Sequence, residues 1–238
     1  MSVNKDKLKR AEKFISEKIQ SICKSRSCKE SIDQSLLLEV SNLVDKPRII
    51  LAKFDKSYLK LPKEVIQSTL QFHQRYFTLI DHKERMSNEF VIVTNKQDKK
   101  KLIKTGNERV VEARLSDASF FWEKDKSQNL IKQINKLKQV TFYENLGSIY
   151  EKTQRLRKMA YFISDQLNLN KEKVEIAASV CKSDLVSGLV GEFPELQGVM
   201  GKYFALAQGF EEDIANSVSD HYLPVGLTSV SYTHLTLP

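Results

Sequence analysis

The spacing of apolar residues changes along this chain, and that change constrains the fold more than any other feature. Residues 6–24 place apolar side chains at helical spacing, with lysines and glutamates on the other face. Short β-branched runs follow at residues 48–54 (RIILAKF) and 89–94 (EFVIVT), which predict buried strands. From residue 99 onward the spacing is helical again. The sequence therefore predicts a mainly helical α+β protein whose strands lie in the first part of the chain.

The α+β part is predicted to contain two further helices and a third strand. Apolar residues at residues 36–44 repeat every three or four positions, and Lys46-Pro47 ends that helix because the residue before proline avoids helical geometry. A helical pattern covers residues 63–76 and leads into a strand at residues 77–80. The tripeptide Asp81-His82-Lys83 is expected to turn the chain into the next strand.

Two capping boxes predict helix starts in the later part. Thr105 with Glu108 precedes a stripe of Val111, Leu115, Ala118 and Trp122. Ser148 with Glu151 precedes an apolar seam that repeats in a heptad-like pattern. The seam comprises Ile149, Thr153, Leu156, Ala160, Ile163 and Leu167. Further helices are expected at residues 174–190, 197–207 and 211–219.

A domain boundary is predicted near residues 145–147, between the α+β part and the helical part. Six of the eight glycines lie at or after Gly188, so close backbone contacts are expected there, with Gly198 and Gly201 close together on one helix face. This division gives domains at residues 1–145 and 146–226. Residues 227–238 (LTSVSYTHLTLP) lack a helical period, follow Pro224-Val225-Gly226, and are predicted to be a non-native tail.

No catalytic or metal-binding motif is found. The chain has no phosphate-binding glycine loop and no G-x-S-x-G sequence, and its four histidines lack metal-ligand spacing. The three cysteines, Cys23, Cys28 and Cys181, are interpreted as reduced thiols. No apolar run approaches the roughly 18 residues that span a bilayer, and no apolar segment follows the basic N-terminus. We therefore expect a cytoplasmic protein that has no catalytic residue, binds no metal and does not associate with a membrane.

A net charge of +8 favours a polyanionic partner, although lysines on solvated helix faces also give such a charge. The candidate nucleic-acid contacts form two groups. Arg109 and Arg114 lie beside acidic residues that could pair with them. Four cations flank the seam with few acids nearby: Lys152, Arg155, Arg157 and Lys158. The aromatic run Phe120-Phe121-Trp122 could stack on bases, but its helical stripe favours a place in the core.

Several long blocks carry a resemblance to a known family. They read GNERVVEARLSDASFFWEKD at residues 106–125, QVTFYENLGSIYEKTQRL at 139–156 and KSDLVSGLVGEFPELQGVMGKYF at 182–204, with HQRYF at 73–77 and DHYLP at 220–224. In this order and spacing they resemble the middle of the glycyl-tRNA synthetase β subunit, over essentially residues 1–226.

That resemblance implies a fold and a set of partners. It implies the later part of a B3/B4-like α+β domain followed by an all-α HD-like domain. It implies an α subunit that carries the glycine and ATP site, with ATP and Mg expected there, and a tetramer of two α and two β subunits. The β subunit is then expected to bind tRNA(Gly) and complete the assembly, and this fragment alone to be non-catalytic.

Two other hypotheses stay open at this point. One is an independent HD-type metal phosphohydrolase. Such a hydrolase carries a His-Asp pair as metal ligands, and this chain has Ser183-Asp184 at that place. One carboxylate cannot hold a hard dication alone, so this hypothesis is disfavoured. A helical adaptor that binds only protein is the third, and tRNA binding that does not depend on salt would favour it. The resemblance also implies that the family's N-terminal region and C-terminal anticodon-binding domain are missing from this chain. An exposed apolar patch is therefore expected where the B3/B4-like domain is cut.

Overall fold

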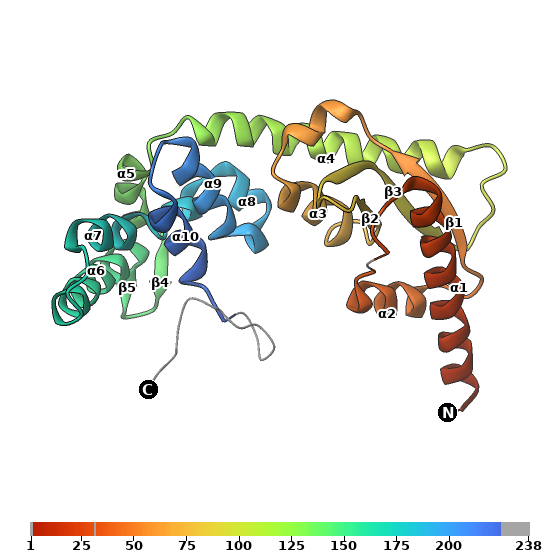
Figure 1. Cartoon of the computed structure of the whole chain (residues 1–238), viewed down its shortest axis with the longest axis horizontal. Coiled ribbons are helices and arrows are strands. Elements are labelled where there is room, and N and C mark those ends of the chain that lie inside the picture. The colour runs from red at the N-terminus through yellow and green to blue at the C-terminus, as the bar shows by residue number, and fades with distance from the viewer. Residues whose placement is uncertain (1, 31, 225–238) are drawn as a thin grey trace. The chain divides into compact units, whose positions relative to one another are not determined.

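The computed structural model describes residues 2–30 and 32–224 and divides the chain into two compact units. These units are Met1–Ser119 and Phe120–Pro238, and the division falls within the long helix α4 (Leu102–Lys126) (Figure 1). Strands β1 to β3 lie in the first unit, which confirms a mainly helical α+β protein. The predicted tail at residues 227–238 lies outside the described residues.

The first unit is built on a three-stranded antiparallel sheet with the order β1-β3-β2. Its strands are β1 (Arg48–Lys53), β2 (Phe77–Ile80) and β3 (Met86–Thr94). All three predicted strands are confirmed, and β3 begins three residues before the run predicted at 89–94. Helices α1 (Ser2–Arg26) and α2 (Gln34–Leu43) pack on it. The core between them consists of Ile15, Ile19, Cys23, Cys28, Leu36, Leu37, Val40, Phe77, Leu79 and Val91.

The connection from β1 to β2 contains the short 3₁₀ helix η1 (Lys56–Lys60) and the helix α3 (Lys63–Gln71). Helix α3 is five residues shorter than the period predicts. Arg75 adopts a left-handed conformation with φ of 59°, and Tyr76 N–H donates to the Leu70 carbonyl, so the chain turns before β2. The expected turn after β2 is present, because the Asp81 carboxylate accepts from the backbone N–H groups of Lys83 and Arg85.

Helix α4 begins at Leu102, so the capping box predicted at Thr105 is wrong. Instead, the Asp98 carboxylate accepts from the N–H groups of Ile103 and Lys104 at 3.1 and 2.9 Å. These are unpaired donors of the first turn, which any nearby carboxylate can cap. The predicted buried stripe is confirmed for Val111, Leu115 and Ala118, which are fully buried.

The second unit contains mostly short helices and one small hairpin. In chain order its elements are α5 (Leu130–Gln133), η2 (Ile134–Gln139), β4 (Thr141–Tyr143), β5 (Gly147–Ser148), α6 (Ile149–Gln166), α7 (Lys171–Val180), η3 (Ser183–Val186), α8 (Gly188–Glu192), η4 (Pro194–Leu196), α9 (Val199–Ala207) and α10 (Glu212–Asp220). The single helix expected at 174–190 is interrupted after Val180. Among residues 2–30 and 32–224, no helix has the length and apolar content that crossing a bilayer requires.

By its contacts, the second unit starts at Phe120, upstream of the boundary that the sequence predicts near residue 145. Asp125 at the end of α4 accepts from the backbone N–H of Leu189 at 2.7 Å. The Gln208 side chain binds the backbone of Leu130 and Gln128 at 3.0 and 2.7 Å. These bonds join residues 125–130 to Leu189 of α8 and to Gln208, which follows α9. By their contacts, residues 125–130 therefore belong to the second unit.

Helices α9 and α10 approach each other closely at the two expected glycines. A Cβ on Gly201 would lie 2.6 Å from Val218 Cγ1, and one on Gly198 would lie 2.5 Å from the Tyr222 ring. Gly198 is the N-cap of α9 with φ of 81°, so it stands just before the helix rather than on its face. The close contact that the glycines predict is confirmed.

Candidate nucleic-acid interface

Helix α6 carries four of the six predicted RNA-contacting cations, and its start is fixed by the capping box at Ser148. The Ser148 N–H donates to Glu151 Oε2 at 2.7 Å, and the Glu151 N–H donates to Ser148 Oγ at 3.3 Å. The bond from the Ser148 backbone is the largest cause that lowers the pKa of Glu151. This capping box is therefore confirmed, and it fixes the residue at which α6 begins.

Arg155 and Lys158 form an exposed pair on α6. Their spacing of three residues places them on one face of the helix, and both are solvent-exposed. Arg155 Nη2 donates to the Leu146 carbonyl at 3.3 Å, which holds the guanidinium at the N-terminal end of the helix. Within residues 2–30 and 32–224 neither side chain forms an ion pair, so both charges are available to a phosphate.

Lys152 and Arg157 are engaged within the unit. Lys152 Nζ lies 3.9 Å from the centroid of the Phe142 ring, a cation–π distance. Arg157 donates to Gln154 Oε1 at 3.0 Å and forms an ion pair with Glu175 of α7. The four neighbouring cations of the sequence are thus two exposed charges and two that hold α6 to its surroundings.

Arg109 and Arg114 lie on α4 in the first unit, and both are exposed. The six candidates therefore lie in two different units. The aromatic run after them is mostly packed: Trp122 stacks on Phe204 with centroids 5.7 Å apart, and Phe121 fills the space beside Gly188. Phe120 is 63 % exposed, so its ring does face solvent.

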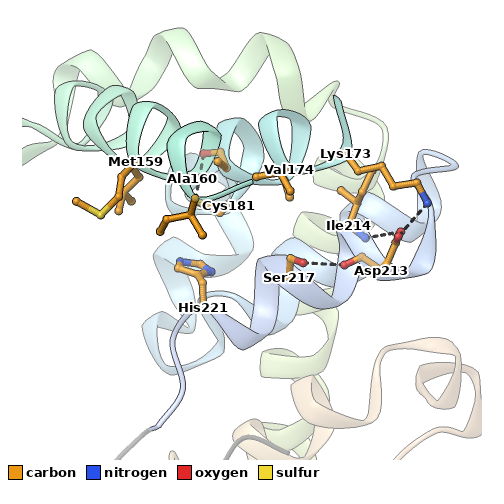
Figure 2. Close-up of a pocket in the computed structure, with 13 residues that line it drawn as sticks. Met159, Ala160, Lys173, Val174, Cys181, Asp213, Ile214, Ser217 and His221 are labelled. Carbon is orange, nitrogen blue, oxygen red and sulfur yellow. Dashed lines mark hydrogen bonds and ion pairs between the residues drawn. The ribbon is translucent and has the colours of Figure 1, made fainter. Parts of the chain in front are cut away.

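An apolar groove of about 490 Å³ lies between α6, α7 and α10. Figure 2 shows side chains of the three helices converging on it. Three residues of the α6 seam, Leu156, Ala160 and Ile163, line this groove, and Ile163 is 45 % exposed. Thr153 of the same seam is fully buried. Helix α7 packs against α6, and the groove runs beside these three seam residues. The facing residues are Val174, Ala177, Ala178, Cys181, Ile214, Ser217 and His221.

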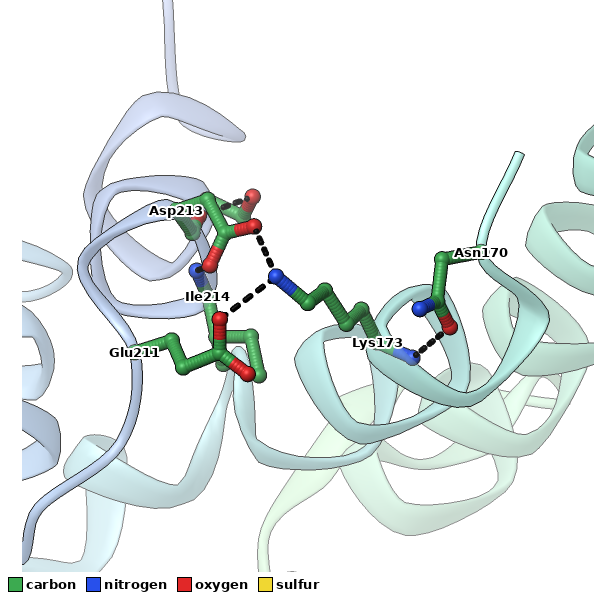
Figure 3. Close-up of polar contacts among 6 residues, drawn as sticks. Asn170, Lys173, Glu211, Asp213 and Ile214 are labelled. Carbon is green, nitrogen blue, oxygen red and sulfur yellow. Dashed lines mark hydrogen bonds and ion pairs between the residues drawn. The ribbon is translucent and has the colours of Figure 1, made fainter.

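A polar network closes one end of the groove. Lys173 Nζ binds Glu211 Oε2 and Asp213 Oδ2 at 2.5 and 2.9 Å, joining α7 to the start of α10 (Figure 3). The bond to Glu211 is the largest cause that raises the pKa of Lys173. Asn170 caps the same turn by accepting from the Lys173 N–H at 3.1 Å. This exposed network orients the two helices that form the groove walls.

The Ser183-Asp184 sequence lies in the interior and has a structural role. Asp184 Oδ2 accepts from the N–H of Gly198 and, at 3.3 Å, from the N–H of Gly201. Its carboxylate thus caps α9, and burial raises its pKa to about 6. Beside it Lys182 Nζ lies 3.7 Å from the centroid of the Tyr222 ring. In the described parts of the chain, no three His, Cys, Asp or Glu side chains are grouped as metal ligands.

The three cysteines are free thiols in the interior of their units. Burial is the largest cause that raises their pKa values, to about 11 for Cys181. A thiol that stays protonated is a poor nucleophile and a poor metal ligand. The interpretation of these cysteines as reduced structural thiols agrees with that placement.

Comparison with known proteins gives one consistent family. The family model described as glycyl-tRNA synthetase beta subunit matches residues 2–233. The glycine–tRNA ligase beta subunits of Thermodesulfovibrio yellowstonii and Streptococcus mutans are each 41 % identical to this chain over 91 % of its length. That of Geotalea daltonii is 42 % identical over 92 %. The chain spans about a third of the length of these relatives, 32 % in each case.

Proposed function

This chain belongs to the glycyl-tRNA synthetase β-subunit family, and on that premise we propose that it supports the ATP-dependent charging of tRNA(Gly) with glycine. Its part is to bind the tRNA and to assemble with the catalytic α subunit. The family match over residues 2–233 carries this proposal. The exposed Arg155 and Lys158 pair and the net charge of +8 are in keeping with an RNA partner.

The proposed partners are those of a two-α, two-β complex in the cytoplasm. The α subunit supplies the glycine, ATP and Mg site, and a second β subunit completes the tetramer. This chain contributes no catalytic residue and no cofactor to the reaction. The apolar groove between α6, α7 and α10 offers a surface on which further protein could pack.

The proposed tRNA contact is electrostatic. Arg155 and Lys158 on α6 neutralise backbone phosphates, which positions the RNA without reading its sequence. Lys152 and Arg157 keep the helix in place through Phe142 and Glu175. Arg109 and Arg114 remain candidates for a separate contact in the first unit.

The finer domain assignment belongs to the same proposal. Residues 1–145 are assigned to a B3/B4-like α+β domain, and residues 146–226 to an HD-like helical domain without a metal. The use of the Asp184 carboxylate as a cap for backbone N–H groups supports a binding and packing role for that domain. It also argues against an independent HD-type phosphohydrolase.

The test is glycylation of tRNA(Gly) by a purified α subunit together with a full-length β subunit that contains this segment. We expect charging only when the β subunit is present. Replacing Arg155 and Lys158 by alanine should raise KM for tRNA about tenfold and flatten its salt dependence, because two phosphate contacts are lost. The matched control replaces Lys132 and Lys136, two exposed cations of the same unit, by alanine.

Each outcome has a distinct meaning. Charging that is indifferent to the β subunit contradicts the proposed function. Charging that needs the β subunit but responds equally to both double variants removes Arg155 and Lys158 as contacts. Binding of tRNA that does not change with salt favours the protein-binding adaptor instead.

A further inference from the structure

A second positively charged surface lies in the first unit. It is a groove of about 520 Å³ between α1, the start of β1 and the loop that joins β3 to α4. We call it the basic groove. Its lining residues are Phe14, Lys18, Arg48, Ile49, Ile50, Lys96, Gln97, Asp98, Lys101 and Lys104.

The basic groove has five cationic side chains and one acidic side chain. That acid is Asp98, whose two carboxylate oxygens accept from the N–H groups of Ile103 and Lys104. Its charge is therefore directed at the start of α4. The groove therefore has an excess of four positive charges over its lining, five cations against one acid that is bound to the backbone of α4.

Four of the five cations have no acidic partner in the parts of the chain that the structure describes. Other lysines of the same unit do: Lys7 pairs with Asp45, and Lys29 pairs with Glu84. The fifth cation of the groove, Lys104, is 3.8 Å from Glu108. The four without a partner are Lys18, Arg48, Lys96 and Lys101, and all four are exposed.

The cations come from three separate segments of the chain, and the lining also includes the apolar residues Phe14, Ile49 and Ile50. On a solvated helix face the charged residues belong to one helix, and acidic residues usually lie among the basic ones. Convergence of like charges from α1, β1 and the loop after β3 is unfavourable unless an anion occupies the groove.

We propose that the basic groove binds the phosphate backbone of RNA as a contact surface additional to Arg155 and Lys158. This inference rests on the proposed function, since it names a second site for the same tRNA partner. The contact follows the backbone and does not depend on base sequence. Lys18, Lys96 and Lys101 each neutralise a phosphate, and Arg48 adds a planar donor group to the wall.

The test compares two triple variants of the 238-residue chain that lose the same charge. One replaces Lys18, Lys96 and Lys101 by glutamine. The control replaces three exposed lysines of the same unit that lie outside the groove, Lys56, Lys60 and Lys83, by glutamine. Binding of a tRNA(Gly) transcript is measured from low to physiological salt, and circular dichroism checks that both variants fold.

We expect the groove variant to bind tRNA(Gly) roughly tenfold or more weakly at low salt, with the log–log salt slope reduced by roughly two to three, because each phosphate contact contributes nearly one. The control should keep the wild-type slope within about one. An unrelated RNA hairpin should show the same losses, because phosphate contacts carry no sequence information.

Three results would overturn the proposal in different ways. Equal slopes for both variants remove the groove, while the proposed function stands if Arg155→Ala with Lys158→Ala still weakens binding. No salt-dependent tRNA binding by the wild-type chain overturns the groove and the proposed function together. Unchanged tRNA binding with lost binding of polyglutamate assigns the groove to an acidic protein surface.

Discussion

Gly106 and Gly201 both lie inside α-helices, yet an added methyl group would meet opposite surroundings at the two positions. A Cβ on Gly106 of α4 would have no atom within 4 Å. A Cβ on Gly201 of α9 would lie 2.6 Å from Val218 Cγ1 and 3.0 Å from Asp184 Oδ2. The first glycine only weakens its helix, whereas the second lets two helices pack.

Replacing each glycine by alanine should therefore change stability in opposite directions. Gly106→Ala should raise the free energy of unfolding by about 0.5–1 kcal/mol, since alanine favours helix and loses less backbone entropy. Gly201→Ala should lower it by about 1–3 kcal/mol through overpacking. Urea unfolding of both variants measures this, and a Gly201→Ala chain as stable as wild type would contradict the packing account.

At the scale of elements, two capping-box sequences with the same spacing occupy different places in the structure. Ser148 and Glu151 form a reciprocal cap at the start of α6. Thr105 and Glu108 have the same spacing but lie inside α4, because Asp98 caps that helix further upstream. A capping box marks a helix start only where no stronger acceptor lies before it.

Ser148→Ala should destabilise the chain by about 1 kcal/mol, because the Glu151 N–H loses its acceptor. Thr105→Ala should be neutral or slightly stabilising, since it only exchanges an exposed helix residue for one of higher propensity. Thermal or urea unfolding distinguishes the two. A loss at Thr105 as large as that at Ser148 would mean that α4 starts where the sequence pattern placed it.

At the scale of the whole molecule, the buried Asp184 makes folding stability depend on pH. Burial raises the pKa of its carboxyl to about 6, from an ordinary value of 3.8. The native chain thus holds a proton that the unfolded chain releases between about pH 4 and 6. Stability contributed by this group is complete below pH 4 and decreases as the pH rises to 6.

Asp184→Asn should remove this dependence, because asparagine keeps an oxygen acceptor for Gly198 and Gly201 but does not ionise. The difference in unfolding free energy between wild type and variant should change by about 2 kcal/mol from pH 4 to 6, because the full slope of about 1.4 kcal/mol per pH unit applies only between the two pKa values. Urea unfolding at several pH values measures it. Parallel stability curves for the two chains would show that Asp184 stays ionised in the native state.

Periodicity in the sequence was enough to locate several elements. The 3.6-residue period located α1, α2 and α6, and the β-branched runs located β1 and β3, since each period follows from which side chains must leave water. The sequence did not predict the β4–β5 hairpin or the break after Val180. It did determine the family, because long blocks of residues are specific. The boundary predicted near residue 145, the tail at 227–238 and the tRNA contacts at the six cations stay predictions.

Which charges are available, and which apolar surfaces are covered, depends on the packing of segments that are distant in the sequence. Arg157 and Lys158 are neighbours in sequence, but Arg157 pairs with Glu175 while Lys158 faces solvent. Lys18, Arg48 and Lys96 are far apart in sequence, but folding brings them to one groove. Local spacing fixes the face of a helix on which a side chain lies. What that face meets depends on segments distant in the chain, and these are placed by packing of the whole unit.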